Sequence, residues 1–390
     1  MGSLVQAAHR LHPDRVATAV AEHLADLGMT DVAVHLVDLA QRLLMPLAVE
    51  GVAPRLALDI DTTVAGRAFR SEQLVEEAAD AGGIRLWVPL VDGAERLGVL
   101  GLTVAQTDEA TRRRASQLAA ISAGLVVSKS VYGDSLVMAR RRHEMDLAAE
   151  LRWSLLPPLT YTNDRVAISG MLEPAYEIAG DCFDYSVNGD LLHLAIVDAM
   201  GHGLEASCMA TLAVTSYRHS RRRELDLVGT FMAMDKVVAD QFGPERYVTG
   251  QLGRLHTGTG RLSWVNAGHP QPLLLRGGHE VSALDCETSL PLGLGYVPAE
   301  VAEVSLEPGD AVLFFTDGVT EARCPEGEMF GRGRLADLFV TASAEGDVPA
   351  EMMRRLVHSV LAHQQGRLQD DATLLLVEWL GPVGLGRKRG

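Results

Sequence analysis

The sequence predicts an α+β protein with two domains joined by a helical linker. At 390 residues the chain exceeds what one ordinary hydrophobic core supports, so two domains are expected. In the C-terminal half, runs of strand type are interrupted by helical stretches without strict strand–helix alternation, which indicates an α+β sandwich. The N-terminal half has the order helix, strands, hairpin and closing helix, which is typical of a small α/β domain with a central antiparallel sheet.

Composition excludes several classes of protein. Charged residues make up 22% and hydrophobic residues 47% of the chain, which is a globular and not a disordered composition. The formal net charge of −16 argues against nucleic-acid binding, which requires a cationic face. Apolar runs fall short of the roughly 20 residues of a membrane helix, and the segment MGSLVQAAHR lacks a signal-peptide pattern. We therefore expect a cytoplasmic protein without membrane contact. The four cysteines stand far apart and predict neither disulfides nor a zinc site.

The N-terminal half contains one strong local signal. Asp92 and Gly93 form the turn expected for a hairpin over residues 88–104. The other expected elements are a helix at 12–27, strands at 31–38, 43–49 and 56–60, a short helix after residue 60, and a helix at 107–132.

The segment VPL, a polar turn and GVLGL together resemble a GAF domain, and the resemblance covers residues 12–130. It implies a sensory role with a small-molecule ligand or a partner. His9, His23 and His35 are interpreted as surface or half-buried residues and not as chromophore or haem ligands.

Residues 131–158 are expected to link the domains. Gly133 breaks the preceding helix, Asp134 or Ser135 can cap a new one, and two prolines stop it after Leu156. This helix carries an apolar stripe. The stripe could pack on either domain, or it could pair with a second copy as a short coiled coil and form a homodimer.

The remaining chain, residues 164–380, is the second domain. Its expected strands are 166–171, 191–197, 248–255, 261–266, 272–276, 311–315 and 372–378, and its expected helices are 204–220, 227–242, 332–341 and 349–363.

Four aspartates stand at predicted strand ends in this domain. Asp198 ends the apolar run in LHLAIVDAMGHG, and Asp317 ends AVLFFTDG. Asp370 precedes ATLLLV, and Asp181 follows a glycine in AGDCFDY. A single aspartate at a strand end is more often a solvated turn residue, but four in one domain indicate a shared site.

All of these candidate ligands supply oxygen, which favours Mg²⁺ or Mn²⁺. Neighbouring glycines let the backbone come close, so the carbonyl of Ala199 is a further candidate ligand. Two ions would relieve the repulsion between the carboxylates and could activate a water for in-line attack on a phosphoryl group. The chain has no GxSxG, CxxxxxR or P-loop motif that would supply a covalent nucleophile or a nucleotide cradle.

Seven motifs then resemble, in order, the SpoIIE family of bacterial PPM-type serine/threonine phosphatases, over residues 147–379. They are EIAGDCFDY, AIVDAMGHGLEAS, VNAGHPQPLLL, LPLGLG, LEPGDAVLFFTDGVTEAR, FGRGRL and QDDATLLLVE. The resemblance implies an α-β-β-α sandwich in which Asp181, Asp198, Ala199, Asp317 and Asp370 hold two Mn²⁺ or Mg²⁺ ions. It also implies a phosphoserine or phosphothreonine substrate on a partner protein, with an anti-sigma-factor antagonist as the expected partner. Ala179 and His256 depart from the family pattern, and His256 is interpreted as a strand-end turn residue.

Several residues keep two interpretations. His202 could act as a general acid or could only shape its glycine-rich turn. His269 is interpreted as packing or bonding with Asn266, and Asp310 as a turn residue. Glu321, Asp371 and Asp184 are candidates for supporting the ligands. For Asp184, a solvated strand-end acid is the alternative. For the whole protein, the alternative to an enzyme is a sensor and scaffold that binds without turnover; four intact aspartates favour the enzyme.

Overall fold

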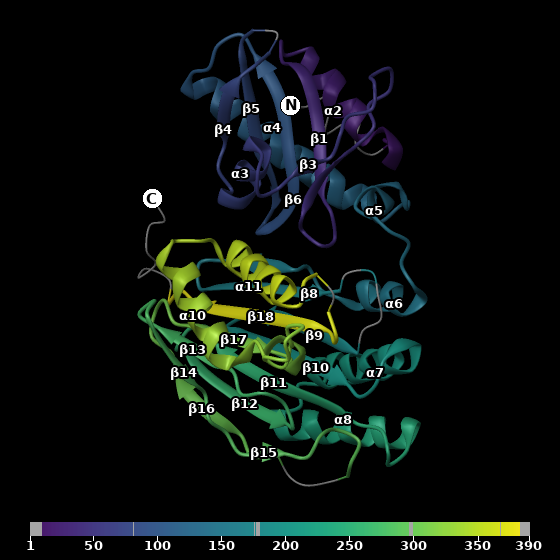
Figure 1. The fold of residues 1–390 in the computed structure, drawn as a ribbon, viewed down its shortest axis with the longest axis vertical. Helices are drawn as coiled ribbons and strands as arrows, with labels where there is room; N and C mark the ends of the chain where they lie inside the picture. Colours follow the sequence, from purple (N-terminus) through teal and green to yellow (C-terminus); the bar gives the residue numbers. More distant parts are fainter. Residues whose placement is uncertain are drawn as a thin grey trace. The chain divides into compact units, whose positions relative to one another are not determined.

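The computed structural model describes residues 10–80, 82–174, 176, 180–295, 299–366 and 368–382. The chain divides into two compact units, Met1–Glu144 and Met145–Gly390 (Figure 1). The finer division into 12–130, 131–158 and 164–380 stays an interpretation. Within the described residues, no helix combines the length and the apolar character that a membrane crossing requires.

The N-terminal unit is built on a six-stranded antiparallel sheet with the order β3-β2-β1-β6-β5-β4, which confirms the predicted central sheet. Its strands are β1 Thr30–Val37, β2 Leu43–Pro46, β3 Leu58–Asp59, β4 Val75–Ala78, β5 Ile84–Asp92 and β6 Glu95–Val104. Its helices are η1 Pro13–Arg15, α2 Val16–Ala25, α3 Val64–Ser71, α4 Glu109–Ser130 and α5 Ser135–Ala139. Asp92 pairs with Glu95, so the hairpin loop is Gly93 and Ala94, one residue later than predicted. Gly93 has a φ of +63°, which glycine adopts without strain.

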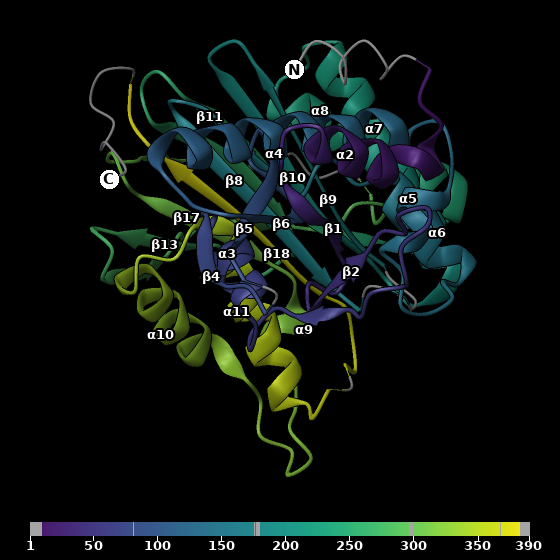
Figure 2. The same ribbon diagram turned by 90° about the horizontal axis from the view of Figure 1, so that it is seen from above.

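Both faces of this sheet are covered. On one face α2 and α4 pack over a cluster that includes Val34, Leu86 and Leu100 (Figure 2). On the other face Phe69 of α3 and Trp87 belong to a second cluster. A cavity of about 170 Å³ is lined by Leu36, Leu97, Val126 and neighbouring residues. Sites for small molecules usually measure about 300–1,000 Å³, so this cavity is smaller than a typical ligand site. A small-molecule ligand of the GAF-like domain therefore stays a prediction.

The expectation for His35 was wrong. This residue is buried in β1, and its ring lies edge-on to Trp87 with the ring centroids 5.8 Å apart. Burial, with the nearby charges of Arg55 and Arg85, lowers the pKa of His35 to about 4. It is therefore a neutral core residue at pH 7. His23 is half-buried, whereas His9 lies outside the described residues.

The single linker helix that we expected is also wrong. The structure has two short helices, α5 and α6 Leu147–Leu155, separated by residues 140–146. The reason is local: Asp146 is an N-cap whose side chain accepts a hydrogen bond from the backbone N–H of Ala149, so a new helix starts there. With the helix interrupted, the apolar stripe is not continuous. The homodimer loses its main support and stays an untested prediction.

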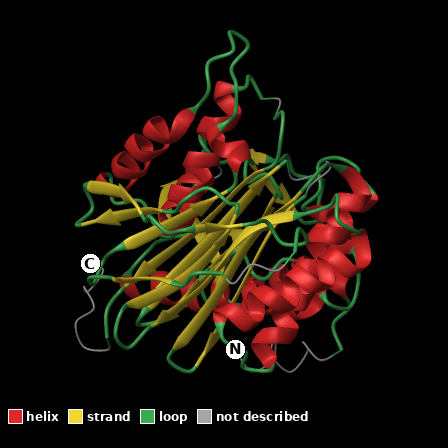
Figure 3. Cartoon of the chain, turned by 90° about the horizontal axis from the view of Figure 1, so that it is seen from below, coloured by secondary structure: helices red, strands yellow, loops and turns green. Residues whose placement is uncertain are grey.

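The C-terminal unit is an α-β-β-α sandwich, which confirms the predicted fold class. One sheet has the order β14-β13-β17-β18-β8-β7, and the other has the order β15-β12-β11-β10-β9 with β16 beside β12. Figures 1 and 3 show the two sheets stacked between pairs of helices. The strands are β7 Thr160–Thr162, β8 Val166–Glu173, β9 Asp181–Asn188, β10 Leu191–Ala199, β11 Val248–His256, β12 Arg261–Ala267, β13 Leu273–Arg276, β14 Glu280–Ala283, β15 Thr288–Ser289, β16 Ala302–Ser305, β17 Ala311–Phe315 and β18 Ala372–Trp379.

Three cores hold this unit together. Between the sheets, Phe183, Trp264, Phe314 and Leu375 pack in one cluster. One outer face is covered by α7 Gly203–Arg222 and α8 Leu227–Phe242. The other is covered by α10 Gly331–Ala344 and α11 Pro349–His363, and a short helix, α9 Asp317–Thr320, follows β17. Since the central strands are buried on both faces, AVLFF and ATLLLV are continuous apolar runs.

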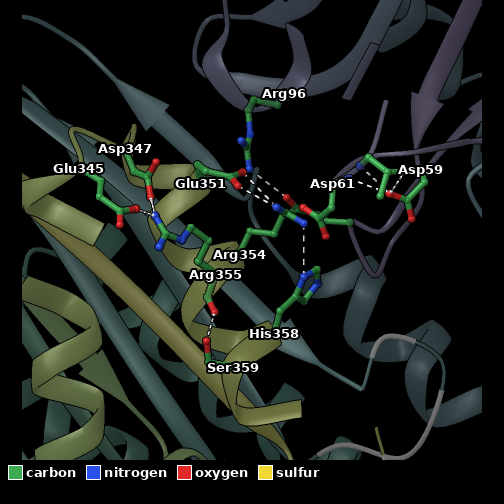
Figure 4. A network of polar contacts seen from close by, with 12 residues as sticks. Asp59, Asp61, Arg96, Glu345, Asp347, Glu351, Arg354, Arg355, His358 and Ser359 are labelled. Atoms are coloured by element: carbon green, nitrogen blue, oxygen red, sulfur yellow. Dashed lines mark hydrogen bonds and ion pairs between the residues drawn. The ribbon is translucent and has the colours of Figure 1, made fainter. Parts of the chain in front are cut away.

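A network of polar contacts includes residues of α11 and of the connection between α10 and α11 (Figure 4). On α11, Glu351 and Arg354 form an ion pair with a distance of 2.7 Å between oxygen and nitrogen. Arg355 pairs with Glu345 and Asp347, which lie in the connection between α10 and α11. These pairs hold that connection against α11.

Candidate functional site

The strand register brings the predicted aspartates to one end of the sandwich. β9 and β10 are antiparallel neighbours in which Asp181 lies directly opposite Asp198. In the other sheet β17 ends at Phe315, so Asp317 leaves its end just where Asp371 enters β18. The apolar runs end in carboxylates at this edge because the strands pass there from the buried core into the connecting loops.

Two side chains join the sheets at this end. One carboxylate oxygen of Asp371 accepts hydrogen bonds from the backbone N–H of Gly180, at 2.7 Å, and of Asp181, at 3.4 Å. The hydroxyl of Thr316 donates to Asp181 Oδ2 at 2.6 Å and accepts from the backbone N–H of Thr373 at 3.0 Å. Asp181 is thus held from the opposite sheet through its backbone and its side chain.

Two glycines are required by close backbone contacts at the site. A Cβ atom on Gly180 would lie 2.4 Å from the carbonyl oxygen of Ala199. A Cβ atom on Gly318 would lie 1.9 Å from the carbonyl oxygen of Asp371. Side chains at these positions would push apart the segments that carry Asp181, Ala199 and the Asp370–Asp371 pair.

The carboxylates concentrate negative charge at this end of the sandwich. Burial, together with the charges of Asp317 and Asp370, raises the pKa of Asp198 to about 7. Burial, with Asp198 and Asp371, raises the pKa of Asp181 well above its usual value. Burial, then Asp370 and Glu321, also raises the pKa of Asp317. An oxygen-only donor set with this charge fits hard divalent cations, which would neutralise it.

These shifts predict how the stability of the metal-free protein depends on pH. Carboxylates with raised pKa hold more protons in the folded than in the unfolded chain, so the stability falls as pH rises from about 4 to about 7. Asp198→Asn should reduce this dependence because the amide does not titrate. Thermal unfolding of both proteins in chelator, at about pH 5 and about pH 8, measures it. An equal pH dependence in the two proteins would contradict this assignment.

The ligand assignment itself stays a prediction. Asp181, Asp198, Ala199, Asp317 and Asp370 all lie at this end of the sandwich. Asp370 is exposed, and its Oδ1 accepts a hydrogen bond from the backbone N–H of Asp371. Among the described residues, no three Asp, Glu, His or Cys side chains already stand in a metal-coordinating group.

The two histidines of the motifs differ in exposure. His202 is exposed at the N-cap of α7, where its side chain makes no capping bond, so both of its interpretations stay open. His269 is buried, its Nδ1 lies 2.9 Å from Thr249 Oγ1, and it exchanges two hydrogen bonds with Asn266. Burial lowers the pKa of His269 to about 3. A histidine that is neutral at pH 7 has no proton to give as imidazolium, so the packing interpretation is the better one.

Other candidates fall outside the cluster. For Asp184, the alternative of a solvated strand-end acid was wrong, whereas a supporting role stays a prediction. This residue lies buried within β9 and pairs with Arg218 and Arg221 of α7. Asp310 is a turn residue, as predicted: it accepts a hydrogen bond from the backbone N–H of Glu307 and pairs with Arg276. His256 is the last residue of β11, also as predicted. Ala179 lies outside the described residues.

Sequence reasoning missed two residues at the site. Thr316 immediately precedes Asp317 in FFTDG, so its position in the motif was a usable signal. Arg152, in the segment LRWSLLPP, is 2% exposed and its Nη1 lies 3.6 Å from Asp371 Oδ1. Nothing in the helical spacing of its segment indicated this contact.

Thr316 gives a testable result. Thr316→Val keeps the shape but leaves the N–H of Thr373 and one oxygen of Asp181 without their partner. We expect a loss of about 1–3 kcal/mol in the free energy of unfolding of the metal-free protein, measured in urea. Thr341→Val is the control, since the hydroxyl of that exposed residue bonds only within its own helix. Equal stability of the two variants would show that the Thr316 bonds are not important.

A cavity of about 570 Å³ lies elsewhere in the same unit. Its lining includes Leu191, Arg254, His256, Ser263 and Val301. Leu191 starts β10 and His256 ends β11, so the cavity is at the opposite end of these strands from Asp198. We place the candidate site at the aspartate cluster and not at this cavity, because the interacting carboxylates and the hydrogen bonds that join the two sheets lie at the cluster.

Comparison with known proteins agrees with this architecture. Residues 188–380 match the family described as Stage II sporulation protein E (SpoIIE). The C-terminal unit belongs to the SpoIIE family. Phosphoserine phosphatase RsbU of Bacillus subtilis is 22% identical to the chain over 240 residues, which cover 60% of this chain and 70% of RsbU. Protein IcfG of Synechocystis is 22% identical over 268 residues, which cover 60% of this chain and 41% of IcfG.

Among solved structures, the SiaA-PP2C domain of Pseudomonas aeruginosa superimposes with a TM-score of 0.51 at 21% identity. The match covers 59% of this chain and 94% of that domain. This likeness shows the fold of the SpoIIE unit. The aspartates discussed above, Asp198 and Asp317 among them, lie in or beside the segment that matches SpoIIE.

Proposed function

We propose that the C-terminal unit is a metal-dependent protein phosphatase that hydrolyses phosphoserine or phosphothreonine on a partner protein. The observation that carries this proposal is the convergence of Asp181, Asp198, Asp317 and the Asp370–Asp371 pair at one end of a SpoIIE-family sandwich. The name of the relative RsbU, a phosphoserine phosphatase, supports the proposed substrate class.

Each residue of the cluster has a proposed role in this reaction. Asp181, Asp198, Asp317, Asp370 and the Ala199 carbonyl would hold two Mn²⁺ or Mg²⁺ ions. The ions would supply a water of lowered pKa and neutralise the phosphoryl oxygens. Asp371 and Thr316 hold Asp181 in place by the hydrogen bonds described above. His202 is exposed beside this end and is the candidate for giving a proton to the leaving oxygen.

The partner is proposed to be an anti-sigma-factor antagonist, the class that the sequence resemblance implies. A protein substrate can supply the orientation that a small ester lacks. We expect the full chain with Mn²⁺ to release phosphate from a phosphoserine-bearing antagonist much faster than from p-nitrophenyl phosphate or free nucleotides. Equal efficiency on nucleotides would instead indicate a nucleotide phosphohydrolase.

The alternative is a scaffold that binds a phosphoprotein without turnover. It is favoured by the lack, in the described part of the chain, of a ready coordinating group of three side chains. The same assay decides between the two: binding of the phosphoprotein without phosphate release, at any Mn²⁺ concentration, would support the scaffold.

The N-terminal unit is proposed to be a GAF-like sensory domain that regulates the phosphatase. A chain beginning near Asn163 would lack β7 and α6, including the buried Arg152, so the truncation should begin at Met145, where the second unit starts. We predict that the chain 145–390 differs from the full chain several-fold in rate or Mn²⁺ affinity. Equal values would show that the first unit does not regulate the second.

A further inference from the structure

Arg152 is a buried cation that lies beside the aspartate cluster but belongs to a helix and not to the strands that carry the aspartates. It lies on α6, is 2% exposed, and directs Nη1 toward Asp371 Oδ1 at 3.6 Å. Its Nη2 donates to the carbonyl oxygen of Pro174, just beyond the end of β8. The planar guanidinium thus contacts two different segments with two of its nitrogens.

The partner of Arg152 is the residue that positions Asp181. Asp371 uses its other oxygen, Oδ2, to accept the backbone N–H groups of Gly180 and Asp181 at the start of β9. The two carboxylate oxygens therefore face different partners, the backbone N–H groups at Oδ2 and the guanidinium at Oδ1. Loss of the guanidinium would leave Asp371 held through Oδ2 only and would remove the positive charge that offsets two buried carboxylates.

The helix that carries Arg152 is itself attached to this unit. Leu155 and Leu156 pack on the cluster beneath α7. Arg218 of α7 donates to the carbonyl oxygen of Leu155 at 2.6 Å. The position of Arg152 is thus set by packing on the sandwich.

We propose that Arg152 is a positioning residue of the metal centre: it holds Asp371, which fixes the start of β9 and so the carboxylate of Asp181. This inference rests on the proposed function, because it assigns Arg152 to the same site. It predicts that Arg152 affects metal affinity mainly through Asp371.

The test measures Mn²⁺ binding to the full chain by calorimetry after removal of bound metal. We expect Arg152→Gln to weaken Mn²⁺ affinity about 10–100-fold, the size of effect that loss of the outer groups around a metal site usually has. Arg276→Gln is the matched control, because it also removes a guanidinium from a buried aspartate, Asp310, in a turn outside the cluster. This control should bind Mn²⁺ as the wild type does.

A double-mutant cycle with Asp371→Asn separates positioning from a general structural effect. If Arg152 acts through Asp371, Arg152→Gln changes Mn²⁺ affinity little in the Asp371→Asn background. The same loss in both backgrounds, or wild-type affinity in Arg152→Gln, would overturn the inference. If Arg152→Gln does not fold, as judged by circular dichroism, Arg152→Lys replaces it in the cycle, since lysine keeps the charge but not the two-nitrogen fork.

Failure of this inference and failure of the proposed function give different results. If the wild-type chain binds Mn²⁺ but releases no phosphate from the phosphoprotein, the proposed function is wrong. The double-mutant cycle then still decides whether Arg152 is a positioning residue. If the wild-type chain releases phosphate but the effects of Arg152→Gln and Asp371→Asn on Mn²⁺ affinity are additive, only the role proposed for Arg152 is wrong.

Discussion

Asp198→Asn and Asp317→Asn are each expected to lower Mn²⁺-dependent phosphate release by about a hundredfold or more. Each change removes one negative charge from the proposed ligand set. Neither side chain belongs to the hydrophobic core, so the fold should persist. Because burial and neighbouring carboxylates raise the pKa of both residues, the metal-free variants should be as stable as the wild type or more stable.

The control for this experiment is Asp337→Asn, which changes an exposed aspartate on α10. Phosphate release from the phosphoprotein and urea unfolding are measured on all proteins. Near wild-type rates in both Asp198→Asn and Asp317→Asn would show that the ligand assignment is wrong. A loss of rate accompanied by a loss of stability would point to a structural role for these residues.

Removal of divalent metal is expected to have an effect of the same size. The proposed ligands are carboxylates and one carbonyl, and hard cations prefer such oxygens. Activity should vanish in excess chelator and return with Mn²⁺ or Mg²⁺ but not with Zn²⁺ at the same concentration. The measurement is phosphate release after each addition. Turnover that persists in excess chelator would contradict the two-metal mechanism.

Much of the C-terminal fold could be predicted because its strands carry strong local signals. The strands β10, β17 and β18 are continuous apolar runs, so their positions and the aspartates at their ends were predictable from the sequence. The N-terminal sheet was predictable for a similar reason, since a turn glycine, Gly93, separates two apolar runs.

The strand β9 was missed because its sequence, DCFDYSVN, has two acids among few apolar residues. The structure satisfies them from other elements: Thr316 and Asp371 hold Asp181, and two arginines of α7 pair with Asp184. Long-range partners of this kind leave no periodic signal in the local sequence. Burial therefore could not be read from hydrophobicity there.

The break in the linker was missed because one residue decides it. Asp146 caps a new helix, and this local bond outweighs an apolar stripe with helical spacing. Arg152 was missed for the opposite reason, since its partner Asp371 lies more than two hundred positions away in the chain. The sequence could thus place the aspartates at strand ends but could not show what holds them.

The number of Mn²⁺ ions bound per chain tests whether the carboxylates form a two-metal centre. Calorimetric titration of the metal-free wild-type protein should give two ions per chain, and the double variant Asp198→Asn, Asp317→Asn should lose this binding. Absence of Mn²⁺ binding in the wild type, or unchanged binding in the double variant, would contradict a metal centre at this end of the sandwich.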